Sequence, residues 1–249
     1  MPYVTKFSSY HEEAWRATIA LNNMAVMMHE RGAHDQAHEV LRDASMIMVA
    51  APDGPEEIET LNLRMTVHRA NASLASLPSV ASKDVSVLSC EVKELIESVL
   101  NSSRSTSPCA PRPQFRFIRF ENFSAMPEPN LTSHEGMLGS IVIYNLALSH
   151  IHRLAQPEHQ GTAQSDRATA FVLLDLSNRI LFPSAYVDSS YFTIFRVLLV
   201  RTAVHLSSTQ GPPEDVVVYD QIDEVLRGFV RDMSSKLDPY YVESTAPAA

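Results

Sequence analysis

One helical hairpin near the N-terminus constrains the fold of this chain more than any other feature. From Tyr10 to Arg31, the residues Trp15, Thr18, Leu21, Ala25 and Met28 recur every three or four positions, which places them on one face of an α-helix. Gly32 follows, and glycine adopts the left-handed conformation that commonly ends a helix. The same periodicity then resumes, so the sequence predicts two antiparallel helices joined by a glycine turn.

Helical periodicity continues along most of the chain, and alternation typical of strands is rare. After Tyr10–Arg31, we expect helices over about 33–50, 55–75, 82–100, 133–155, 166–181, 189–207 and 213–235, with a loop over 156–165. Breaks rich in Pro, Gly and Ser separate them. The sequence therefore predicts an all-α protein of about eight helices in antiparallel pairs.

A stretch rich in Ser and Pro interrupts the helices, and it suggests three regions. Residues 1–100 form N-terminal helical repeats, residues 101–131 a linker with a short extended segment, and residues 132–240 C-terminal helical repeats. The extended segment is FRFIRF, residues 115–120, whose aromatic residues and Ile favour a strand. We expect Phe115, Phe117 and Phe120 to fill a gap between helix pairs; the alternative is a platform on which RNA bases stack.

Composition narrows the class of function. The formal charge is −9, which argues against nonspecific nucleic-acid binding because that binding needs clustered Lys and Arg. The longest apolar run contains Arg196 and Arg201, so no membrane span is expected. Cys90 and Cys109 lack CxxC spacing, and we interpret them as reduced thiols, with a disulfide as the alternative. No secretory leader is visible in the first residues, which predicts an intracellular protein of cytoplasm or nucleus.

The first hairpin resembles a tetratricopeptide repeat. Asn23-Met24-Ala25 stands where that family carries Asn-Leu-Gly, and Gly32 matches its turn glycine. Ala37, Leu41 and Ala44 match its small-large-small series, in which small residues allow two helices to approach closely. The resemblance implies an α-solenoid.

A second copy of this pattern begins at IVIYNLALSHIHRLA. Asn145-Leu146-Ala147 repeats the motif, and Ala170, Leu174 and Ser177 occupy the small-large-small positions. Its style also resembles uncharacterised tetratricopeptide-like proteins of diatoms, a likeness that implies no activity. The two copies together cover about a quarter of the chain.

The resemblance implies a binding groove on the concave face, formed by the first helix of each pair. In that family the Asn of Asn-Leu-Gly often hydrogen-bonds the backbone of a bound peptide, and Asn23 and Asn145 match it. Further residues on the same helices are expected to flank them: Asn22, His29, Tyr144, His152 and Arg153. The alternative is that both asparagines only satisfy neighbouring backbone inside the array.

The histidine-rich stretch HERGAHDQAH raises the possibility of metal chemistry. It differs from HExxH in spacing, and Gly32 breaks the helix that would place both imidazoles on one face. We expect His34 to pack near the start of the second helix and His38 to lie on the surface. His150 and His152 are two residues apart and point to different faces. We therefore predict no metal site, no catalytic residue and no cofactor.

The predicted function is a non-enzymatic interaction scaffold that binds a peptide or partner protein on its concave helical face. The alternative is a helical regulatory domain that binds a small ligand between its two halves. A metal-dependent hydrolase built on a helical fold is a third, weaker interpretation.

Overall fold

The structure is a computed structural model that describes residues 3–50, 57–76, 86–89, 116–120, 131–181 and 190–208. The chain divides into two compact units. One comprises Met1–Cys90 with Phe115–Ala185, and the other comprises Glu91–Gln114 with Tyr186–Ala249. The predicted linker lies outside the described residues except for 116–120 and Leu131, and so does the helix expected over 213–235.

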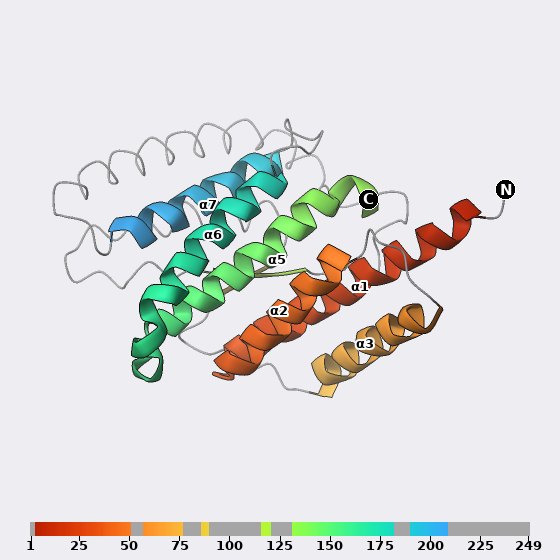
Figure 1. The fold of residues 1–249 in the computed structure, drawn as a ribbon, viewed down its shortest axis with the longest axis horizontal. Coiled ribbons are helices and arrows are strands. Elements are labelled where there is room, and N and C mark those ends of the chain that lie inside the picture. Colours follow the sequence, from red (N-terminus) through yellow and green to blue (C-terminus); the bar gives the residue numbers. More distant parts are fainter. Residues whose placement is uncertain are drawn as a thin grey trace, which may run out of the picture. The chain divides into compact units, whose positions relative to one another are not determined.

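The described residues are mostly helical, as predicted. The first unit contains the α-helices α1 (Tyr3–Glu30), α2 (His34–Ala50), α3 (Glu57–Ser76), α5 (Leu131–Leu154) and α6 (Ala163–Leu181) (Figure 1). In the second unit the structure describes α7 (Ser190–Ser208). No helix within these described ranges combines the length and the apolar character needed to cross a membrane.

The turn between α1 and α2 follows the sequence expectation. Gly32 has a φ of 79°, a conformation that a side chain with a Cβ rarely adopts. The Ala33 N–H donates to the Met28 carbonyl at 3.0 Å, and the Gly32 N–H donates to the His29 carbonyl at 3.1 Å. These two bonds form a Schellman motif, which satisfies carbonyls that the helix end would leave unpaired.

The two hairpins that carry the repeated pattern pack against each other, although about a hundred residues separate them in sequence. Helix α5 packs on α6 and also on α2 and α1 (Figure 1). Ala25, Ala37 and Leu41 of the first hairpin form one core cluster with Leu146 of the second. The small-large-small positions of both copies are buried.

Close approach between helices explains the small residues at the contacts of α5 with its neighbours. On α5, a Cβ added to Gly139 would lie 3.0 Å from Met48 Sδ of α2 and 3.4 Å from a ring carbon of Trp15 on α1. The Ser140 hydroxyl donates to the Ser177 carbonyl at 2.7 Å, and the Ser177 hydroxyl donates to the Ser140 carbonyl at 2.7 Å. Ser177 therefore replaces the motif's alanine while holding α5 and α6 together.

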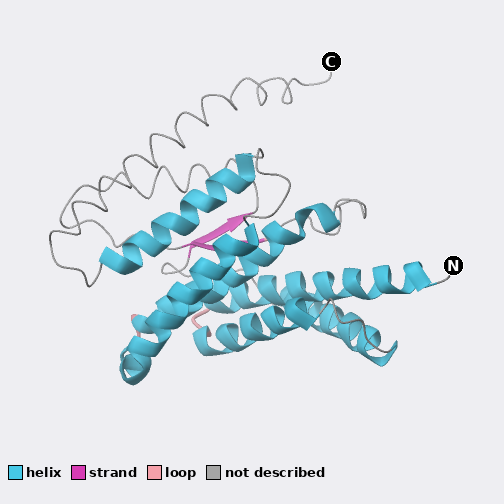
Figure 2. Cartoon of the chain, turned by 45° about the horizontal axis from the view of Figure 1, so that its top comes forward, coloured by secondary structure: helices cyan, strands magenta, loops and turns pink. Residues whose placement is uncertain are grey.

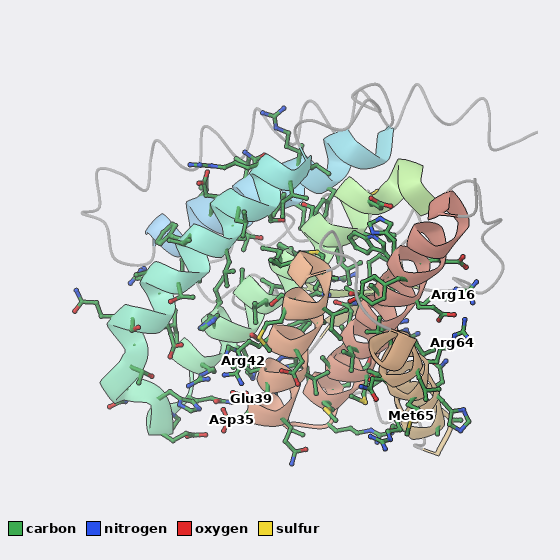
Figure 3. All side chains as sticks on the ribbon, turned by 45° about the vertical axis from the view of Figure 1, so that its right-hand side comes forward. Arg16, Asp35, Glu39, Arg42, Arg64 and Met65 are labelled. Carbon is green, nitrogen blue, oxygen red and sulfur yellow. The ribbon has the colours of Figure 1, made fainter. Side chains whose placement is uncertain are left out.

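Helix α3 packs against α1, so the pairs are not stacked in sequence order. Leu63 forms a core cluster with Ala14 and Ala17 of α1. Arg64 of α3 binds Glu13 of α1 at 2.9 Å, and Arg64 and Met65 are labelled on this helix in Figure 3. A solenoid of eight consecutive helices is thus not confirmed; the described residues form six α-helices.

Two segments differ from the expected elements. The helix expected over 82–100 is wrong at residues 86–89, where β1 (Ser86–Ser89) pairs in parallel with β2 (Arg116–Arg119). Pairing with a parallel strand about thirty residues away decides the structure here, because the helical spacing of apolar residues around Val87 is weak. The loop expected over 156–165 contains a 3-10 helix, η4 (Pro157–Thr162). The strand expected at FRFIRF is confirmed for 116–119, and the strand pair appears in magenta in Figure 2.

Candidate functional site

The backbone N–H and carbonyl of Ile118, in β2, are held by two asparagine side chains from different helices. The Ile118 N–H donates to Asn145 Oδ1 at 2.9 Å. Its carbonyl accepts from Asn145 Nδ2 at 2.7 Å and from Asn22 Nδ2 at 3.1 Å. Asn145 Nδ2 also donates to Asn22 Oδ1 at 2.8 Å, so α1 and α5 are linked across the strand. All three residues are buried.

A third asparagine repeats the arrangement two residues further along the chain, at Phe120, which directly follows β2. The Phe120 N–H donates to Asn23 Oδ1 at 2.9 Å, and the Phe120 carbonyl accepts from Asn23 Nδ2 at 2.8 Å. An asparagine amide carries one acceptor oxygen and two N–H donors, so it pairs with both backbone groups of one residue. Asn23 and Asn145 thus act as substitutes for a neighbouring strand.

These asparagine contacts satisfy the backbone hydrogen-bonding groups on one side of the strand. In an extended strand the backbone N–H and carbonyl groups of successive residues point in opposite directions. Those of Ile118 and Phe120 face the asparagines, so those of Phe117 and Arg119 face the side where β1 pairs. Buried backbone groups that lack partners are costly, and the asparagines remove that cost inside a helical core.

The side chains of β2 fill the space between α1 and α5, as the sequence predicted for this segment. Phe117, Ile118 and Phe120 are all buried, and β2 contacts both helices. The Phe117 ring stacks on the His29 imidazole with centroids 4.1 Å apart and an interplanar angle of 24°. Because both described aromatic rings are buried, they are not available to stack on RNA bases.

A row of three imidazoles extends from this stack, one from each of α1, α2 and α5. His29 Nδ1 lies 3.2 Å from His34 Nδ1, and His34 Nε2 lies 3.1 Å from His152 Nε2. Burial, together with the smaller effects of the neighbouring imidazoles of His152, His34 and His38, lowers the pKa of His29 from 6.5 to about 2. His29 is therefore neutral at pH 7, which allows it to stack on Phe117 without a buried charge.

A second polar group lies beside the imidazole row. His38 Nδ1 is 2.9 Å from the Ser149 hydroxyl, and the His38 ring meets the His150 ring edge to face with centroids 4.5 Å apart. His150 Nδ1 is 2.7 Å from Asp166 Oδ1, and Arg153 Nε is 3.8 Å from Asp166 Oδ2.

The surface position expected for His38 is wrong, because α5 packs on α2 there and buries the ring. The pKa of His38 is lowered to about 4, mainly by burial. His150 and Arg153 contribute to the lowering, and Glu39 and Asp166 partly oppose it. His150 and His152 do point to different partners, as their spacing predicted: His150 meets His38, and His152 meets His34. His38 is therefore neutral at pH 7 within the α2–α5 interface.

The predicted groove residues fall into two sets. Asn22, Asn145 and His29 contact β2, and Asn23 contacts Phe120, the residue directly after β2. The remaining three lie elsewhere on α5: Tyr144 is fully buried, His152 borders His34, and Arg153 borders Asp166 and His159.

The asparagine site is the set of Asn22, Asn23 and Asn145 that holds residues 118 and 120. The sequence did not reveal that the chain itself occupies this site. FRFIRF and the two asparagines were each recognised, but nothing in their spacing connects residues about a hundred positions apart. The apolar residues Phe117, Ile118 and Phe120, close together between breaks rich in Pro and Ser, were the available signal for a buried strand.

No family model, no curated protein and no solved structure matches the sequence or the fold. The tetratricopeptide assignment therefore stays a prediction from residues. The asparagine contacts are the feature on which a function can be argued.

Around Ile118 and Phe120 the asparagine side chains offer amide hydrogen bonds to a peptide backbone. Among the described residues, no group of three or more His, Cys, Asp or Glu side chains is placed to hold a metal ion. The Ser149 hydroxyl near His38 is buried and donates to the Leu146 carbonyl at 2.7 Å. A nucleophile in that position would not reach a substrate in solution. The arrangement pairs backbone donors and acceptors with amides.

Proposed function

We propose that this protein is a non-enzymatic interaction scaffold whose helices hold the backbone of an extended peptide from a partner protein. The observation that carries the proposal is the two-residue clamp on β2. Asn145 and Asn23 each bond both the N–H and the carbonyl of one residue, at Ile118 and Phe120. Residues spaced by two along a strand present their peptide groups on one side, so the clamp suits any extended chain.

Recognition through the backbone explains why a helical protein would bury several amides. A buried asparagine without partners costs about 1–3 kcal/mol per unsatisfied group, whereas a peptide laid across these asparagines satisfies them. The site is therefore complementary to an extended backbone and unfavourable when empty. In the described structure the chain's own residues 117–120 occupy it.

The charge of the chain favours a protein partner. With a formal charge of −9, the surface repels phosphate backbones and suits segments that carry basic residues. We place this partner inside the cell, in keeping with a chain that carries two cysteines without metal-binding or redox spacing.

A comparison of three baits tests the proposal. The full chain, an Asn23→Ala variant and an Asn71→Ala variant would be used to capture proteins, with quantification by mass spectrometry. Asn71 is exposed on α3, so its substitution controls for loss of an asparagine. We expect Asn23→Ala to lose partners that the other two retain, with cross-links from the retained partner mapping beside residues 116–120. Identical capture by all three baits would refute the proposal.

A further inference from the structure

The side chains of β2 differ in their surroundings in a way that defines a sequence pattern. Phe117 is stacked on His29, Ile118 is fully buried, and Phe120 is buried. Arg116 and Arg119 are only half-buried. Phe117, Ile118 and Phe120 are therefore the three positions recognised through contact with the helices.

We propose that the asparagine site selects partner segments with the pattern aromatic–aliphatic–any residue–aromatic, and that such a segment replaces residues 117–120 of the chain itself. This inference rests on the proposed function and adds side-chain selectivity to it. The first aromatic residue stacks on His29, the aliphatic residue fills the space of Ile118, and the last aromatic residue takes the place of Phe120.

The resident strand is a built-in competitor for such a segment. Because β2 is joined covalently to the helices that hold it, its effective concentration at the site is on the order of millimolar. A free peptide of the same sequence therefore binds the unaltered chain weakly. A substitution that loosens β2 without touching the asparagines should make binding of the free peptide stronger.

The test uses the full chain and a fluorescein-labelled peptide of sequence QFRFIRFEN, which copies residues 114–122. Binding is followed by fluorescence anisotropy. A Phe117→Leu variant keeps an apolar side chain but loses the stack on His29, and it should bind the peptide at least about threefold more tightly than the unaltered chain. Asn23→Ala, introduced into the Phe117→Leu chain, should weaken binding by about tenfold.

Two altered peptides test the pattern. One carries Ala in place of the residue that copies Phe117, and the other carries Ala in place of the residue that copies Phe120. Each should bind the Phe117→Leu chain at least about threefold more weakly than QFRFIRFEN. Equal binding of all three peptides, with loss on Asn23→Ala, would leave the proposed function standing and overturn the selectivity. No binding by any peptide to a Phe117→Leu chain that still unfolds cooperatively would overturn both.

Hydrogen exchange can be measured on the unaltered chain, so this test does not require that a variant folds. At saturating peptide, the amides of Ile118 and Phe120 in the chain should lose protection, because the free peptide has taken their place. Unchanged protection at saturation would mean that the peptide binds elsewhere, and it would contradict the exchange of strands.

Discussion

Replacing Asn145 with Ala should destabilise the first unit strongly, because its side chain completes three hydrogen bonds at once. Without it, the Ile118 N–H loses its acceptor, and Asn22 Oδ1 loses its donor. The Ile118 carbonyl keeps the bond from Asn22 Nδ2. The substitution therefore leaves two polar groups buried without partners.

Each such group costs about 1–3 kcal/mol, so we expect the free energy of unfolding to fall by about 2–6 kcal/mol. The assay is urea denaturation followed by circular dichroism. Asn71→Ala on the exposed face of α3 is the matched control, and it should change stability by less than about 0.5 kcal/mol. A loss below about 1 kcal/mol for Asn145→Ala would show that water or movement of the chain satisfies these groups. That result would refute the reasoning.

Three other changes probe the packing around the strand. His29 and His38 have pKa values of about 2 and 4 in the folded chain, below the 6.5 of the unfolded chain, so the unfolded state binds more protons as pH falls. The free energy of unfolding should therefore drop by about 2.5 kcal/mol between pH 7 and 5.5. A constant free energy of unfolding over this range would contradict the prediction. Gly139→Leu should cost about 1–3 kcal/mol or more in thermal unfolding, because a Cβ alone already lies 3.0 Å from Met48 Sδ; unchanged stability would show that α5 can move away. Ser177→Ala should cost only about 1 kcal/mol, since it removes one hydroxyl bond and restores the motif residue; a loss above about 3 kcal/mol would mean that the hydroxyl does more than join α5 and α6.

The sequence predicted the helices well because their signals are local. Gly32 ended α1 where the left-handed conformation was required, and the small-large-small series of α2 and α6 identified the buried face of each helix. Ala37 and Ala170 are both fully buried as that register implies. Periodicity over four or five turns is enough to establish such a face.

The sequence did not predict how distant segments meet. The position of β1 depends on a parallel partner in β2, and a short apolar stretch such as 86–89 fits either a helix or a strand by its spacing. His38 was misplaced because its burial depends on α5, whose contact with α2 no local pattern reports. Asn23 and Asn145 were recognised as groove residues, yet their occupant lies in the chain itself.

Hydrogen exchange at Ile118 and Phe120, measured by NMR in the unaltered chain and in Asn23→Ala, tests the asparagine clamp most directly. If the asparagines hold this strand, both amides of the unaltered chain exchange only through unfolding of the first unit. In Asn23→Ala, the amide of Phe120 should exchange at least about tenfold faster than that of Ile118, which keeps its bond to Asn145. Rapid exchange of both amides in the unaltered chain would contradict the account, because it would mean that the strand is not held by the asparagines.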